Sequence, residues 1–235
     1  LGWNIHDMKR ANGLEIYISQ GAKPGLGGQL MAKKVTPELA RIRGIPPGID
    51  LRSPSRHPDI LGADDLVIKV EELREATSYR LPVSVKLGAG RVRDDIKIAA
   101  KDGFDFVELD GMQGSTGAAS TEVLEYVGIP TLPAIIEAIE ALEEIGARDR
   151  IQIVLMGGLR DGIDAVKALC LGADGVWTGT LWLACRESDS DMIIKEKLIA
   201  ATADDTTYSK TVSGFPMRVT KCPWTEEWAK PEAPS

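Results

Sequence analysis

Two glycine-rich turns in the second half of the chain have the residue types that bind phosphate. Residues 157–162 read Gly-Gly-Leu-Arg-Asp-Gly, and residues 178–180 read Thr-Gly-Thr. Each turn follows a short apolar run, at 151–156 and at 175–177, that is typical of a strand. Backbone N–H groups at such turns approach and neutralise phosphate, and the last two strands of a (β/α)8 barrel commonly provide them. The pair of turns therefore predicts a phosphate-binding site.

A second candidate region is the long polar segment at 20–63, which we call the excursion. It far exceeds the ~2–6 residues that usually connect a strand to a helix, and such long connections are often functional. It begins with a glycine-rich run at 21–28, and it is rich in cations although the chain as a whole is acidic. Its charged side chains include Lys23, Lys33, Lys34, Arg41, Arg43, Arg52 and Arg56, together with His57 and Asp59. Composition leaves two interpretations open, namely a solvated loop or a substrate lid whose cations receive a carboxylate.

Lys86 lies near the end of an otherwise apolar strand at 82–87. A lysine is costly to bury without a partner, and barrel strands present their carboxyl ends to the active site. Lys86 is therefore a candidate site residue, and the alternative is a lysine that reaches solvent at the rim. Glu108 and Asp110 end the next strand, before a glycine turn at 111–118. One of these carboxylates can orient a neighbouring group, although an ordinary tight turn fits the spacing equally well.

The elements that position these residues alternate along the chain. The predicted strands are residues 14–19, 82–87, 104–110, 151–156 and 175–178. The predicted helices, in which apolar residues recur every three or four positions, are residues 63–78, 92–101, 132–145 and 163–171. This alternation is typical of βαβ units and predicts a parallel sheet in an α/β fold. Since a closed (β/α)8 barrel has eight strands, either further strands precede this chain or the sheet is open.

Composition narrows the class of protein. A chain of 235 residues with 43% apolar content is long enough for one domain with a sizeable core. Its net charge of -7 disfavours nucleic acid and anionic membranes as partners, and no apolar run approaches the ~20 residues of a membrane span. Cys170, Cys185 and Cys222 are widely spaced and form no CxxC motif, which favours reduced structural thiols in a cytoplasmic protein without a metal site.

Several longer stretches match a known family. They are SQGAKPGLGGQL (19–30), KVTP (34–37), HPD (57–59), PVSVKL (82–87), DG (110–111), GSTGA (114–118), GGLR (157–160) and LGAD (171–174). Together they make residues 1–182 resemble the FMN-binding synthase domain of glutamate synthase. The GAKPG run with its following GGQL is specific, whereas many phosphate-binding barrels share the GG turn.

The resemblance implies strands four to eight of a TIM barrel, bound FMN, and reduction of 2-iminoglutarate, formed from 2-oxoglutarate and ammonia, in glutamate biosynthesis. It implies that Lys23, Gln29, Arg43 and His57 bind the oxo acid, and that Lys23 and Lys86 are catalytic. Lys86 would stand beside the pyrimidine end of the flavin, where positive charge stabilises the anionic reduced ring. The other implied cofactor-binding residues are Asp110, Gly114, Ser115, Thr116, Gly117, Gly157, Gly158, Arg160, Gly179 and Thr180.

The chain departs from the family pattern in three ways. Tyr17 occupies the position of a second substrate-site lysine, six residues before Lys23. The cysteine cluster that holds an iron–sulfur cluster after the last barrel strand is replaced by Cys185 alone, with Cys222 far beyond it. The first three barrel strands are not in the chain, so we expect a missing segment or a partner chain to complete the barrel in an oligomer.

The tail, residues 183–235, is expected to be a helical extension, and it resembles the tail of nitronate monooxygenases, another FMN barrel family. Those enzymes use a histidine in a turn whose equivalent here, residues 113–117, reads Gln-Gly-Ser-Thr-Gly. An oxidase of the nitronate monooxygenase type is therefore one alternative function. The other is a non-catalytic half-barrel that binds a ligand or supports the assembly of a partner.

Overall fold

A five-stranded parallel sheet forms the centre of the protein, as seen in a computed structural model that describes residues 4–116, 119–211 and 217–233. The strands lie in the order β1 (Leu14–Tyr17), β4 (Val83–Gly88), β5 (Phe106–Asp110), β6 (Gln152–Met156) and β7 (Gly175–Trp177). All neighbouring pairs are parallel. The predicted α/β fold, a partial barrel of five strands, is confirmed.

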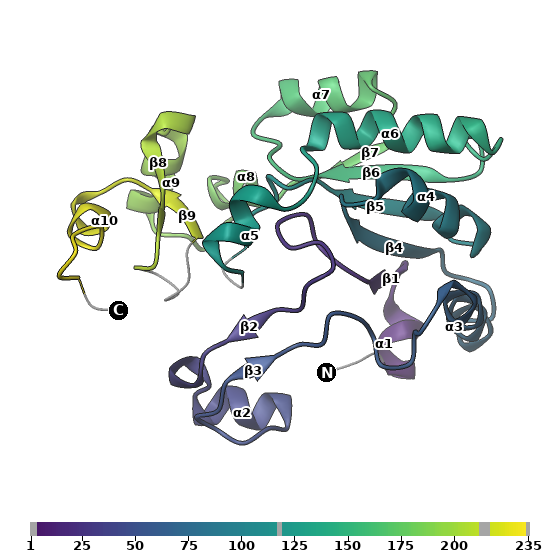
Figure 1. The fold of residues 1–235 in the computed structure, drawn as a ribbon, viewed down its shortest axis with the longest axis horizontal. Helices are drawn as coiled ribbons and strands as arrows, with labels where there is room; N and C mark the ends of the chain where they lie inside the picture. Colours follow the sequence, from purple (N-terminus) through teal and green to yellow (C-terminus); the bar gives the residue numbers. More distant parts are fainter. Residues whose placement is uncertain (1–3, 117–118, 212–216, 234–235) are drawn as a thin grey trace.

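Four helices cover one face of this sheet, which we call the outer face (Figure 1). They are α3 (Ala63–Ala76), α4 (Val92–Lys101), α6 (Thr131–Glu144) and α7 (Gly162–Cys170). Apolar side chains at alternate strand positions, such as Val85, Val107 and Ile153, pack against them in a single core. Because successive side chains of a strand point to opposite faces, the remaining positions form the other face.

The face opposite the helices, which we call the inner face, carries polar and charged side chains. Its residues include Glu15, Tyr17, Ser84, Lys86, Glu108, Asp110, Val154 and Trp177. Trp177 remains 51% exposed and Tyr17 remains 42% exposed. A closed barrel would enclose this face, whereas the five strands of this chain leave it partly open.

Backbone conformation sets one helix boundary that periodicity misses. The helix predicted over 63–78 ends at Ala76, and Ser78 and Tyr79 both adopt positive φ angles, of 53° and 55°. A residue in this left-handed conformation cannot continue a right-handed helix. The other three predicted helices agree with the structure to within a residue at each end, and 92–101 agrees fully.

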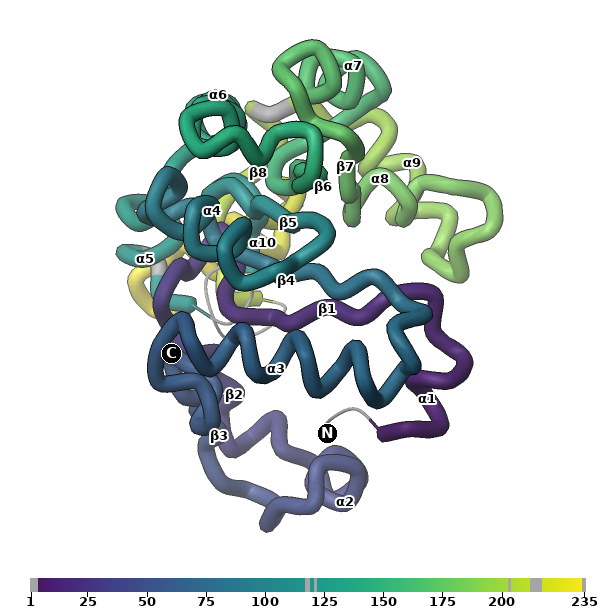
Figure 2. Tube along the Cα trace, turned by 90° about the vertical axis from the view of Figure 1, so that its right-hand side faces the viewer, coloured from purple at the N-terminus to yellow at the C-terminus, as the bar shows by residue number. Residues whose placement is uncertain are grey.

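The excursion is more ordered than a solvated loop. It contains a short antiparallel pair, β2 (Gln29–Leu30) with β3 (Leu51–Arg52), a turn of 3-10 helix η1 (Ala32–Lys34), and α2 (Pro37–Arg43). Thr36 caps α2 by accepting a hydrogen bond from the N–H of Leu39, and Gly44 ends the helix with a φ of 66°. Figures 1 and 2 both show this segment projecting beyond β1, on the side away from α6 and α7.

Shorter elements complete the chain. They are α1 (Ile5–Arg10), α5 (Thr121–Tyr126), α8 (Thr180–Leu183), α9 (Met192–Ala200), η2 (Ala203–Asp205), β8 (Thr206–Ser209), β9 (Met217–Thr220) and α10 (Pro223–Glu227). The tail expected to be helical therefore also contains an antiparallel strand pair, β8 with β9. None of the described helices has the length and hydropathy needed to cross a membrane.

Candidate functional site

The two glycine turns lie side by side at the carboxyl edge of the sheet. Met156 of β6 pairs in register with Trp177 of β7, so the residues that follow each strand leave the sheet together. Gly157 and Gly158 have positive φ angles of 101° and 72°. A Cβ on Gly158 would lie 2.6 Å from the Cβ of Gln113, and one on Gly157 would lie 2.7 Å from the carbonyl oxygen of Gly111. Packing against the turn after β5 therefore requires both glycines, whatever they bind.

The second turn is the more open of the two. Gly179 is exposed, and a Cβ built on it would meet nothing within 4 Å. Thr180, the first residue of α8, is also exposed. The residues predicted to bind phosphate thus divide into a packed turn and an open turn on neighbouring strands.

Arg160 has a protein partner. Its Nε lies 2.9 Å from Oδ2 of Asp164, and Lys167 binds the other carboxylate oxygen of Asp164 at 3.1 Å. These two hydrogen bonds hold the pKa of Asp164 well below its usual range. Asp161 caps α7 beside them by accepting from the N–H of Asp164. Arg160 therefore belongs to a charged cluster around the start of α7, with a side chain that is 70% exposed.

Lys86 lies on the inner face between two aromatic rings. Its Nζ is 5.5 Å from the ring centre of Tyr17 and 5.3 Å from that of Trp177, within the range of cation–π attraction. The same Nζ is 4.0 Å from Oδ2 of Asp110. The side chain of Lys86 is only 16% exposed, so it is not a lysine that simply reaches solvent. That this cation belongs to a functional site stays a prediction.

Asp110 connects Lys86 with the start of the excursion. It is 5% exposed, and its Oδ2 accepts a hydrogen bond of 3.0 Å from the N–H of Gly21. Burial raises the pKa of Asp110, and the Gly21 N–H and Lys86 oppose that shift. Gly114 packs against the same carboxyl group, since a Cβ there would lie 2.4 Å from Oδ1. Asp110 therefore anchors two loops in addition to facing Lys86.

Lys23 and Gln29 line one small pocket of about 110 Å³. The other lining residues are Leu26, Gly27, Ala119, Ser120 and Val123. Lys23 is 7% exposed, and burial lowers its pKa. The loop reaches this position because Gly21 lies directly on β5, where a Cβ would come within 1.9 Å of the Gly111 carbonyl oxygen. Two of the four predicted substrate-binding residues are thus brought together.

The other two are placed elsewhere. His57 lies at the end of β1, where its Nε2 is 2.7 Å from the carbonyl oxygen of Tyr17. Arg43 is exposed at the end of α2, which Figure 1 shows at the far end of the excursion. It does not line the pocket of Lys23 and Gln29.

The turn after β5 is held by Gln113, whose Oε1 accepts hydrogen bonds from the N–H and the hydroxyl of Thr131, at 2.9 and 2.8 Å. Ser115 is exposed and Thr116 is half-buried beyond it. Gly117, also predicted to line the flavin, lies outside the described residues. Among the described residues, no group of His, Cys, Asp and Glu side chains is arranged to hold a metal ion.

The inner face also contains residues that the sequence analysis did not select. Glu15 and Ser84 are polar groups next to Glu108 and Lys86, and Trp177 supplies one of the aromatic contacts of Lys86. The sequence contains a signal for this face. Residues 15 and 17, 84 and 86, and 108 and 110 occupy alternate positions in three predicted strands. Alternation places such residues on one face.

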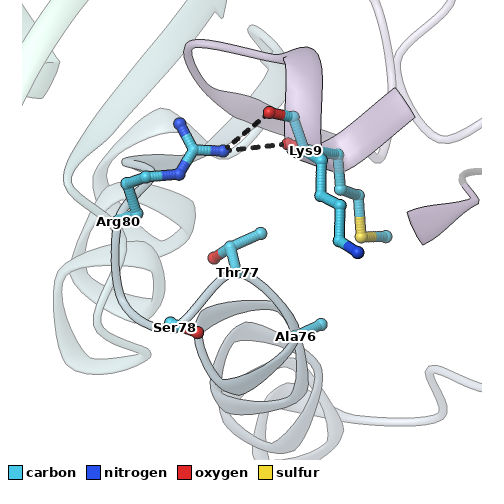
Figure 3. A pocket seen from close by; sticks show the side chains of 6 residues that line it. Lys9, Ala76, Thr77, Ser78 and Arg80 are labelled. Carbon is cyan, nitrogen blue, oxygen red and sulfur yellow. Dashed lines mark hydrogen bonds between the residues drawn. The ribbon is translucent and has the colours of Figure 1, made fainter. Parts of the chain in front are cut away.

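A second hollow, of about 570 Å³, lies at the opposite end of the strands (Figure 3). Met8, Lys9, Ala76, Thr77, Ser78 and Arg80 line it. The Nη2 of Arg80 donates to the carbonyl oxygens of Met8 and Lys9, at 3.3 and 3.2 Å, and so ties the segments that lead into β1 and β4. Barrel chemistry occurs at the carboxyl ends of the strands, so this hollow is not the candidate site.

Comparison with known proteins matches this chain to one family model and to relatives whose names agree with it. The family model described as "Conserved region in glutamate synthase" matches residues 1–188. The chain is 48% identical to a glutamate synthase large subunit-like protein of Rhizobium meliloti, over 76% of this chain and 40% of that protein. It is 42% identical to an archaeal glutamate synthase [NADPH] of Methanocaldococcus jannaschii, over 79% of this chain and 37% of that protein.

Among solved structures, FabK of Thermotoga maritima (M276A mutant) aligns with a TM-score of 0.48 and 23% identity, over 69% of this chain and 47% of that chain. The chain spans about 40% or less of the length of the two glutamate synthase relatives above. The family match covers most of the chain, and it confirms the resemblance stated from the motifs. This protein belongs to the glutamate synthase family, as a chain that contains its conserved region.

Proposed function

We propose that this chain forms the FMN and substrate site of an oxidoreductase that makes glutamate by reductive amination of 2-oxoglutarate. Family membership supports the proposal, as do relatives named glutamate synthase. The observation that carries it is the environment of Lys86, a largely buried cation between two aromatic rings at the carboxyl edge of a parallel sheet.

The residues present fit FMN. Lys86 keeps its charge available, because Asp110 is 4.0 Å away and already accepts the Gly21 N–H. A fixed cation here would stabilise the negative charge of a reduced flavin at its pyrimidine end. Gly179 and Thr180 have open space for a phosphate group, and Gly157 and Gly158 would offer backbone N–H groups beside them. Arg160 would add charge to this phosphate site only as a member of its cluster with Asp164.

The pocket of Lys23 and Gln29 would receive the oxo acid. Since burial lowers the pKa of Lys23, a bound carboxylate would stabilise its charged form. Gln29 would add a neutral hydrogen-bonding group for the same ligand. When bound and reduced, FMN would supply the hydride for reduction of 2-iminoglutarate and would be oxidised in the step. The chain's part is to orient the substrate with Lys23 and Gln29 and to fix the electrostatics with Lys86.

Other assignments belong to the same proposal. Residues 1–182 would form the FMN-binding part, and residues 183–235 would be an added tail. Further strands, from a longer protein or from a partner chain, would cover the inner face within an oligomer. We place the protein in the cytoplasm. Arg43 and His57 would join the substrate site when the excursion closes over a ligand.

FMN binding tests the proposal directly. Titrating the chain with FMN, followed by quenching of flavin fluorescence, should give saturable binding, and Lys86→Ala should weaken it roughly ten- to hundredfold because a charged contact contributes about 1.5–3 kcal/mol. Lys101→Ala, at a side chain that is 73% exposed on α4, is the matched control and should leave the affinity unchanged. Equal effects of both variants, or no binding by the chain and by a longer protein that contains it, would reject the FMN assignment.

Substrate choice needs a second experiment. In a longer protein with FMN bound and reduced, 2-oxoglutarate with ammonia should reoxidise the flavin, and Lys23→Ala should raise the 2-oxoglutarate concentration needed. Reoxidation by a nitronate alone would replace the glutamate assignment with the nitronate monooxygenase alternative.

A further inference from the structure

Two carboxyl groups lie near each other on the inner face, beside Lys86. Glu15 on β1 pairs in register with Ser84 on β4, and Lys86 on β4 pairs with Glu108 on β5. Ser84 is small and lies between the two glutamates, so their longer side chains reach each other across it. Glu108 is accordingly one of the groups that raise the pKa of Glu15.

The hydrogen bonds of the Glu108 carboxyl group indicate where a proton is needed. Glu108 is 3% exposed, and its Oε1 accepts a hydrogen bond of 2.8 Å from the hydroxyl of Ser84. Its Oε2 is fully buried and receives no donor from the charged or neutral donor groups in the described part of the chain. A buried oxygen without a donor is costly, and two ionised carboxylates in contact repel. One proton on Glu15 removes both costs, since Glu15 then donates to Glu108.

We propose that Glu15 and Glu108 hold a single proton between them and form a proton-binding site on the inner face, beside Lys86. This inference rests on the chain's own residues and goes beyond the proposed function. Burial and then contact with Glu108 raise the pKa of Glu15 to about 8, whereas Lys86 opposes the shift. Glu15 is therefore mainly protonated at neutral pH.

Tyr17, Asp110 and Ser84 are the polar groups of the inner face that lie next to this pair. Tyr17, from the same strand as Glu15, stays neutral, because burial and then the charges of Asp110 and Glu15 raise its pKa to about 12. Asp110, the next inner-face residue of β5 after Glu108, has a pKa that burial raises, although the Gly21 N–H and Lys86 oppose that shift. Ser84 donates its hydroxyl to Glu108 and so stabilises the carboxylate of that residue.

The pair places a proton donor on the inner face, a role for which neither His57 nor His6 is positioned. His57 contacts the backbone at the end of β1, and His6 lies on α1. The acid pair instead lies on β1 and β5, on either side of β4, and is on the face of the sheet that carries Lys86. Loss of its proton would add a second negative charge close to Lys86 and weaken the attraction of that cation for any bound anion.

Infrared spectroscopy of the 235-residue chain tests the proposal. Glutamate labelled with ¹³C at its side-chain carboxyl separates a protonated glutamate from the aspartates Asp95, Asp102 and Asp110, whose pKa values burial also raises. We expect a protonated glutamate band at neutral pH that disappears with a midpoint near pH 8. Absence of this band in the folded wild-type chain would overturn the proposal without any variant.

Variants locate the proton. Glu15→Gln should abolish the band, and Glu108→Gln should lower its midpoint because contact with Glu108 contributes to the raised pKa of Glu15, whereas Glu196→Gln on the exposed surface of α9 should leave the band unchanged. Ser84→Ala should shift the midpoint upward, since it removes a donor to the charged form. A band that survives Glu15→Gln, or a midpoint unmoved by both Glu108→Gln and Ser84→Ala, would show that this pair does not bind the proton.

Discussion

The outer and inner faces of the sheet are built from the same five strands and differ in almost every physical property. The outer face is apolar, with Val85, Val107 and Ile153 at most 1% exposed beneath four helices. The inner face carries two buried carboxyl groups and a lysine, and it leaves Trp177 half-exposed. Alternation along each strand separates the two sets of residues. Folding depends mainly on one set, which leaves the other available for chemistry.

The largest expected effect comes from neighbouring residues of β6 that point to opposite faces. Ile153→Ala, at a fully buried outer position, should lower the free energy of unfolding by about 3–4 kcal/mol through lost burial and a cavity. Val154→Ala, on the half-buried inner face, should lower it by only about 1 kcal/mol. Urea unfolding followed by circular dichroism measures both, and equal losses would contradict the division between the faces.

A close backbone approach at the inner edge should give the next largest effect. Gly21→Ala would place a Cβ 1.9 Å from the Gly111 carbonyl oxygen, so the excursion must move away from β5 and the Gly21–Asp110 hydrogen bond is lost. We expect a loss of about 3 kcal/mol in unfolding free energy, the upper part of the usual range for overpacking.

Gly162→Ala is the matched control, because a Cβ at the first residue of α7 meets nothing within 4 Å. It should leave stability unchanged or raise it slightly, since alanine favours a helix. Similar losses for both glycines would show that the approach of the excursion to β5 is not tight.

The outer face was largely predictable from the sequence, because periodicity reports it directly. Apolar residues spaced by three and four positions gave α4 to the residue, and apolar runs gave the five strands. The end of α3 was missed because Ser78 and Tyr79 adopt a left-handed conformation that no local pattern announces. The pair β2 and β3 was also missed, since strands of two residues have no period to detect.

The inner face was predictable only in part. Lys86 and Asp110 stood out as charges at strand ends, but the Glu15–Glu108 contact depends on a small residue between them on a third strand. Gly157 and Gly158 were interpreted as phosphate ligands, whereas the structure first explains them by packing against a turn more than forty residues earlier in the chain. Such contacts arise from tertiary structure, so one segment cannot reveal them.

Asp102, on the side of the sheet that the helices cover, is a buried carboxyl group like those of the inner face. It is 2% exposed at the end of α4, and neither carboxyl oxygen has a hydrogen-bond partner within the described residues. Burial raises its pKa, so the folded state binds its proton more tightly than the unfolded state does. The charge therefore destabilises the fold as pH rises above the unfolded value of 3.8.

Asp102→Asn should accordingly raise the thermal unfolding midpoint at neutral pH, and this gain should vanish below pH 3.8, where both states of the wild-type chain are protonated. Calorimetry over a pH series measures it. Asp149→Asn, at an exposed site, should give no such pH-dependent gain. A gain that is constant across pH would mean that charge is not the cause.

The smallest expected effect is that of replacing Arg160, because Asp164 and a bound phosphate would compete for its guanidinium. Because its guanidinium is exposed and already paired with Asp164, Arg160→Ala should change stability little and should weaken FMN binding only severalfold. Arg93 is an exposed arginine of α4 that pairs with Glu140 and Glu144 of α6, and Arg93→Ala should leave FMN binding unchanged. Fluorescence titration compares them. If neither variant alters the affinity, Arg160 serves the start of α7 alone, and the open turn at Gly179 and Thr180 becomes the principal phosphate contact.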